Sequence, residues 1–153
     1  MKLTFFTDGA VKNNGGAGRM GYAAIAVWGD QRREFSEFCD SESATNQRAE
    51  VLAVILAAQA VPNKKRPEID LTIVTDSEWA IECLKKLLGL PSLYKKIQCN
   101  LDLLEATASV LSTYKSVTFR HVRGHRGDEL NERANFLAQT AAGTWKGRKE
   151  AKR

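Results

Sequence analysis

The sequence predicts an α/β fold in which one five-stranded mixed sheet, its first three strands antiparallel, carries helices on both faces. Three observations predict it. The chain opens with three strand-like segments and no helical pattern between them. From residue 45 the apolar residues change to helical spacing. Thereafter strand-like and helix-like segments alternate, so that the complete order is βββαβααβα without an internal repeat.

The first three strands are predicted over residues 3–8, 22–28 and 31–39. Residues 9–21 are dense in glycine and asparagine, which predicts a turn or loop between the first two strands. A Gly-Asp dipeptide separates the second strand from the third and is a modest hairpin signal. These segments predict an antiparallel meander.

The remaining elements follow from periodicity and from breaker residues. A helix begins after Thr45, a plausible N-cap, and ends before Pro62. Further along, we expect a strand at 69–74, a helix at 77–88, a helix at 97–112, a strand at 116–122 and a helix at 128–142. Acids end the first and fourth strands, where open α/β sheets carry their sites.

The 153 residues fit one domain, predicted to span 1–142, followed by a basic tail at 143–153. The net charge of +5 is concentrated in that tail. Five cations there oppose Glu150 alone, so five minus one gives +4, and the rest of the chain is close to balanced; the five are Lys146, Arg148, Lys149, Lys152 and Arg153. Such a tail either holds a phosphate backbone or only adds solubility, and charge alone does not separate the two.

Several classes of protein are disfavoured by composition. No apolar run approaches the roughly 20 residues that span a bilayer, and no signal peptide precedes the first strand. Three cysteines without C-x-x-C spacing argue against a disulfide framework or a zinc ribbon. We therefore expect a cytoplasmic protein without membrane contact, monomeric by default.

Three acids carry the chemistry that the sequence suggests. Asp8 and Asp76 end predicted strands, and Glu50 lies in the first turns of a helix, each in apolar surroundings. Salt bridges would explain any one of them alone. Three together predict an oxygen-ligand cluster for Mg²⁺ or Mn²⁺.

Four motifs, TDGA, TNQRAE, TDS and GHRGDELNERANFLA, resemble those of the type 1 ribonuclease H family. They occur in the family's order and cover the chain to about Ala142. The resemblance implies a ribonuclease H-like fold with residues 1–142 as its catalytic domain. It also implies endonucleolytic hydrolysis of the RNA strand of RNA–DNA hybrids, with two Mg²⁺ ions per active site for which Mn²⁺ substitutes, leaving a 3′-hydroxyl and a 5′-phosphate.

The family's roles then transfer residue by residue. Asp8 would bridge both metals, while Glu50 and Asp76 would complete the site of the leaving-group metal. His125 matches the family's loop histidine, which transfers a proton or assists product release. The resemblance further implies contacts with the RNA 2′-hydroxyls or with the DNA strand at six positions. They are Gly9, Thr45, Asn46, Gln47, Glu78 and Trp79.

The pattern departs from the family at its fourth acid, which is Asn135 here. An amide oxygen can ligate a hard cation but brings no charge, so three negative charges replace four as metal ligands. Three interpretations stay open: a natural variant with weakened activity, which we rank first; an engineered Asp-to-Asn change; or a hybrid-binding module with little catalysis. A second departure is residues 84–98, which lack the family's tryptophan-rich basic protrusion.

Rival interpretations rest on fewer residues. Residues 16–21 form a literal G-x-G-x-x-G, but a strand-like segment follows where a dinucleotide site needs a helix. His121 and His125 have zinc-like spacing without accompanying C-x-x-C. Integrases, transposases and junction resolvases share the acid cluster, but TNQRAE and GHRG favour the hybrid-cutting branch. A nonenzymatic hybrid-binding protein is the alternative from another class, and Asn135 alone supports it.

Overall fold

The computed structural model describes residues 1–123 and 128–146. Its strands are β1 (Lys2–Lys12), β2 (Gly16–Trp28), β3 (Gln31–Ala44), β4 (Asp70–Thr75) and β5 (Ser116–His121). Its helices are α1 (Asn46–Gln59), the 3₁₀ helix η1 (Asn63–Glu68), α2 (Glu78–Leu87), α3 (Leu101–Leu111) and α4 (Glu129–Ala142).

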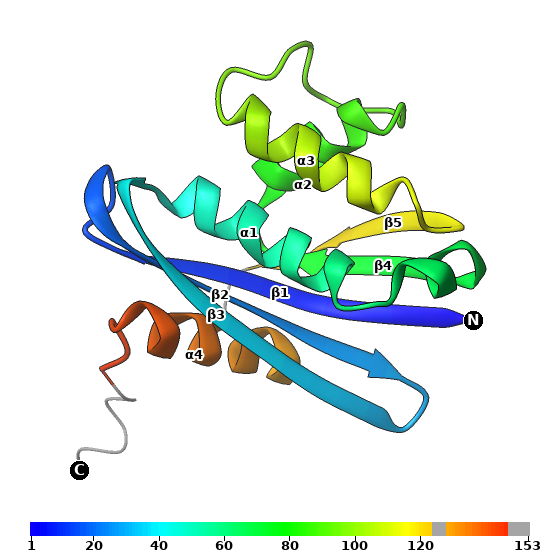
Figure 1. The fold of residues 1–153 in the computed structure, drawn as a ribbon, viewed down its shortest axis with the longest axis horizontal. Helices are drawn as coiled ribbons and strands as arrows, with labels where there is room; N and C mark the ends of the chain where they lie inside the picture. Colours follow the sequence, from blue (N-terminus) through cyan, green and yellow to red (C-terminus); the bar gives the residue numbers. More distant parts are fainter. Residues whose placement is uncertain (124–127, 147–153) are drawn as a thin grey trace.

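The strands form one five-stranded sheet in the order β3-β2-β1-β4-β5. The first three strands pair antiparallel, whereas β4 and β5 run parallel to β1. Helices α1, α2 and α3 cover one face and α4 covers the other (Figure 1). The predicted mixed sheet, with three antiparallel strands first and helices on both faces, is confirmed.

The alternation of apolar side chains along β1 fills a core on each face of this sheet. Phe5 packs with the residues beneath α1 and α3, while Phe6 packs with Ile25, Val74 and Ala134 beneath α4. Because successive strand residues point to opposite faces, a continuous apolar run is what a strand covered on both sides requires. The run that precedes Asp8 is therefore buried on both faces.

The predicted loop at residues 9–21 is wrong. Strand β1 continues to Lys12 and β2 begins at Gly16, so only a tight turn separates them. Asn13 and Gly15 in that turn have positive φ values of 66° and 93°. Glycine and asparagine are the residues that adopt this backbone region most readily. These residue types therefore predict the turn at 13–15 correctly, but the residues on either side of it belong to the two strands.

Gly21, outside this turn, makes room for the backbone of another element. A Cβ atom on Gly21 would lie 2.2 Å from the carbonyl oxygen of Ala138 and 2.4 Å from the amide nitrogen of Ala142. The missing side chain at Gly21 therefore lets α4 pack directly on β2. The literal G-x-G-x-x-G lies within β2, and the next element is β3, so it does not form a dinucleotide-binding turn.

The chain between α2 and α3 contains no helix over residues 88–100, and α3 begins at Leu101 rather than at 97. Glu82 anchors this segment: its Oε1 accepts a hydrogen bond from the amide of Leu93 (2.7 Å), and its carbonyl accepts one from the hydroxyl of Ser92 (2.8 Å). In the described part of the chain, none of the helices is long and apolar enough to span a membrane.

Candidate active site

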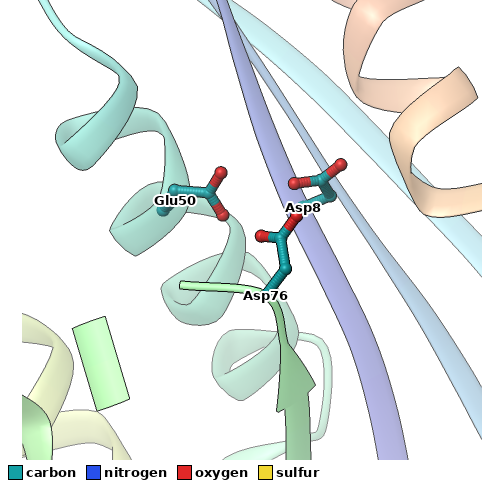
Figure 2. Close-up of side chains that lie close together, drawn as sticks. All are labelled: Asp8, Glu50 and Asp76. Carbon is teal, nitrogen blue, oxygen red and sulfur yellow. The ribbon is translucent and has the colours of Figure 1, made fainter. Parts of the chain in front are cut away.

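Three carboxylates meet at one end of the sheet. Asp8 lies on β1, Asp76 follows the last residue of the neighbouring parallel strand β4, and Glu50 projects from α1. Ligand oxygens of all three lie within 4.8 Å of one another. Figure 2 shows the side chains converging from these elements on one space. The predicted acid cluster is present.

Gly9 explains how α1 comes close enough to deliver Glu50. A Cβ atom on Gly9 would lie 2.3 Å from the carbonyl carbon of Ala49 and 2.6 Å from the amide nitrogen of Glu50. Real Cβ atoms do not approach backbone atoms so closely, so only glycine permits this packing. The amide of Gly9 also donates a hydrogen bond to Asp8 Oδ1 (3.0 Å).

Two of the three acids, Asp8 and Glu50, have raised pKa values in the absence of a cation. Burial, and then the negative charge of Asp76, raises the pKa of Asp8 to about 8. Burial, and then the charges of Asp8 and Asp76, raises the pKa of Glu50 well above its ordinary value. Among the described residues, no hydrogen-bond partner faces Asp8 Oδ2 or Glu50 Oε2, although both atoms are buried. Buried carboxylate oxygens without donors fit a site that a divalent cation completes.

Asn135 of α4 faces the same space. It lines a cavity of about 360 Å³ together with the three acids. The other lining residues are Gly9, Ala10, Val11, Asn46, Gln139 and Thr144. The structure thus brings together the four predicted metal ligands, which come from β1, α1, α4 and the residue that follows β4. Gln139 and Thr144, which line this cavity beside them, belong to none of the motifs and are not predicted from the sequence.

The start of α1 places three predicted substrate contacts in succession. Thr45 is the N-cap, and its hydroxyl accepts a hydrogen bond from the amide of Arg48 (3.1 Å). The amide of Asn46 donates to Asn14 Oδ1 (3.0 Å), and Asn46 also lines the acid cavity. Gln47 Oε1 accepts a hydrogen bond from Cys99 Sγ (3.4 Å). Only Asn46 of the three borders the acids directly.

The start of α2 carries two further residues that are predicted to contact the substrate. Glu78 is exposed in its first turn, and Trp79 is half-buried against the larger core cluster. Trp79 also lines a second, more apolar hollow of about 680 Å³. That hollow is completed by Cys83, Leu93, Tyr94, Lys95, Lys96 and Gln98. It is separate from the acid cavity, with which it shares no lining residue.

Of the two histidines, only His121 lies within the described residues. His125 lies outside the described residues. His121 is the last residue of β5, as expected of a strand residue, and its Nε2 lies 3.1 Å from the carbonyl oxygen of Asp76. Over residues 1–123 and 128–146, the acid cluster is the one group of side chains with metal-ligand geometry, and it contains neither histidine nor cysteine.

Comparison with known proteins identifies the family. The ribonuclease H family model matches residues 1–143. A ribonuclease H of Cupriavidus metallidurans is 36% identical over 143 residues, covering 90% of this chain and 92% of its own. One of Chlorobium phaeobacteroides is 32% identical over 147 residues, covering 92% and 94%.

Solved structures agree. A type 1 ribonuclease H with a type 2 active-site motif superposes with a TM-score of 0.73 at 25% identity, covering 93% of this chain and 72% of the other. The N-terminal ribonuclease H domain of a Mycobacterium tuberculosis protein gives a TM-score of 0.71 at 20% identity, covering 93% and 94%, which shows the shared fold. The chain therefore belongs to the ribonuclease H family of metal-dependent endoribonucleases, as its motifs predict.

Proposed function

We propose that the acid cavity binds two Mg²⁺ ions, for which Mn²⁺ substitutes, and hydrolyses the RNA strand of RNA–DNA hybrids endonucleolytically. The observation that carries this proposal is the convergence of three carboxylates within 4.8 Å, with buried oxygens of Asp8 and Glu50 that no donor faces in the described structure. Two bound cations would stabilise the charge on the attacking and the leaving oxygen of an in-line displacement.

Each residue of the site has a role consistent with its place. Asp8, whose ligand oxygens lie within 4.8 Å of those of both other acids, would contact both cations. Glu50 and Asp76 would hold the one on the leaving-group side, and Asn135 Oδ1 would complete the one on the water side. His125 would carry a proton or assist product release, a role assigned from its motif alone.

The substrate would lie along the ends of α1 and α2. The backbone at Gly9 and the amides of Asn46 and Gln47 would contact RNA 2′-hydroxyls, the feature that distinguishes RNA from DNA. Thr45 would hold a DNA phosphate, Glu78 would contact a base or a sugar, and Trp79 would stack on a sugar of the DNA strand. A monomeric, cytoplasmic enzyme also stays a prediction.

Asn135 should weaken the site, which Asn135→Asp tests directly. Replacing the amide by a carboxylate adds a fourth negative charge beside the cations, so we expect Mg²⁺ to bind about tenfold more tightly, a gain of roughly 1.4 kcal/mol. The cleavage rate at limiting Mg²⁺ should rise by a similar factor. Equal rates for both proteins at every Mg²⁺ and Mn²⁺ concentration would show that the missing charge costs nothing.

The same residue favours one alternative function, a hybrid-binding protein that cleaves little. Loss of one ligand charge affects the bound cations and leaves the substrate-contacting residues of α1 and α2 in place. Tight hybrid binding without cleavage, with cleavage restored by Asn135→Asp, would establish this alternative.

The basic tail is proposed to hold the hybrid in place of the missing protrusion. Trp145 packs edge-on against Phe136 at 4.8 Å, and Thr144 lines the acid cavity, so the chain leaves α4 at the rim of the site. Removing residues 146–153 keeps this anchor and deletes a net charge of +4.

If those cations contact phosphates, truncation should lower the slope of log affinity against log salt by about 2–4, since each contact contributes about 0.9. Hybrid affinity is measured by fluorescence anisotropy between low and moderate salt, beside the full chain. An unchanged slope would assign the tail no part in binding.

A further inference from the structure

The side chain that contacts Asn135 has no role so far. Gln139 lies one helical turn further along α4, and its Nε2 donates a hydrogen bond to Asn135 Oδ1 (3.0 Å). Both residues line the acid cavity. The backbone at Gln139 is fixed because its carbonyl accepts hydrogen bonds from the amides of Gly143 and Thr144, which close the end of the helix.

An amide ligand poses a problem that a carboxylate does not. The two oxygens of an aspartate both accept, whereas an asparagine presents an acceptor oxygen on one side and a donor NH₂ on the other. Asp8 Oδ2 and Glu50 Oε2 are buried acceptors with no donor among the described residues, so they attract the NH₂ end of a freely turning amide. An amide turned that way repels a cation.

We propose that Gln139 is a positioning residue that fixes the orientation of the Asn135 amide, so that its oxygen remains the atom available to a cation. The Nε2 group needs an acceptor, and Oδ1 supplies it with one of its two lone pairs while keeping the other. Pairs of this kind, four residues apart on a helix, stabilise each other's conformation. The inference rests on the proposed metal site and concerns only the amide that replaces the family's acid.

The test combines Gln139→Leu with the identity of residue 135. In the protein with Asn135, losing the donor should weaken Mg²⁺ and Mn²⁺ binding about three- to tenfold, the range expected for one hydrogen bond. In the Asn135→Asp background the same change should weaken binding less than about twofold, because either carboxylate oxygen can ligate. Binding is measured by calorimetry and by the metal-induced rise in melting temperature, neither of which depends on cleavage.

Gln59→Leu, on the exposed end of α1, controls for a glutamine-to-leucine change on a helix and should leave metal binding unaltered in both backgrounds. If Gln139→Leu weakened metal binding equally in both backgrounds, Gln139 would act through packing. If it did not weaken metal binding in the protein with Asn135, Gln139 would not orient the amide. Either result overturns the inference. Absence of any binding of Mg²⁺ or Mn²⁺ overturns it together with the metal site. Background-dependent binding without hybrid cleavage supports the inference and contradicts the proposed function alone.

Discussion

Asp8→Asn should abolish hybrid cleavage while making the metal-free protein more stable. The loss of rate should reach about 10³-fold or more, because this carboxylate contacts both cations in the proposed site and each factor of ten corresponds to about 1.4 kcal/mol of barrier. Addition of Mg²⁺ or Mn²⁺ should not raise the melting temperature of the variant in a saturable way. Asp30→Asn, in the exposed turn between β2 and β3, is the matched control and should retain full activity.

The gain in stability follows from the raised pKa of Asp8. Folding lifts the pKa of this carboxyl to about 8, so between about pH 4 and pH 8 the native chain holds a proton that the unfolded chain has lost. The free energy of unfolding of the metal-free protein should therefore fall as the pH rises through that window.

The Asn variant lacks this titration, so it should be the more stable protein at pH 8. A pKa raised by about 4 units sets an upper limit of about 5 kcal/mol on the gain, at about 1.4 kcal/mol per unit. Urea denaturation in the presence of a chelator measures both proteins across the pH range. If the variant were less stable than the parent at pH 8, the contacts of the Asp8 carboxylate in the folded protein would be favourable, and burial and the charge of Asp76 would not destabilise it.

Gly9→Ala should disable the site through the backbone, without touching a ligand. The added Cβ would lie 2.3 Å from the carbonyl carbon of Ala49, so α1 has to move away and carry Glu50 with it. Overpacking of this kind costs about 1–3 kcal/mol of stability, and a displacement of about 1 Å at a reacting centre costs about 10²-fold in rate.

Gly16→Ala is the control for this prediction, because a Cβ there meets nothing within 4 Å and the residue lies in the same hairpin. It should change neither melting temperature nor cleavage rate appreciably. If Gly9→Ala behaved like this control, the close approach of α1 to β1 would not determine the geometry of the acids.

The sequence predicted the elements whose signals are local. The sequence predicts a helix at 128–142, and α4 spans Glu129–Ala142 with Asp128 as its N-cap, because the signals of a helix lie in and directly beside the helix itself. The acid cluster was predictable because the ends of parallel neighbouring strands meet at one edge of a sheet. Only Asp76 follows the end of its strand, however. Asp8 was predicted to end the first strand but lies inside β1, which continues to Lys12, and it comes beside Asp76 because β1 pairs in parallel with β4 as far as Phe6 and Val74.

The wrong predictions concern residues whose role depends on packing against a segment that is distant in the sequence. Gly9 and Gly21 were interpreted as turn residues, yet each makes room for the backbone of a helix remote in sequence. No local pattern distinguishes a glycine that turns the chain from one that admits another segment. Gln139 did carry a usable signal, its spacing of four residues from Asn135 on a helix, but only the cavity shows that both side chains face the acids.

The central claim is that the acid cavity cuts the RNA strand of a hybrid with the help of divalent cations. Incubating the full chain with a hybrid labelled at the 5′ end of its RNA, over a titration of Mg²⁺ and of Mn²⁺, tests it most directly. We expect internal cleavage of the RNA that leaves 3′-hydroxyl ends, requires one of the two cations and disappears in Asp8→Asn. RNA that stays intact at every concentration of both cations, while the protein binds the hybrid, would contradict it.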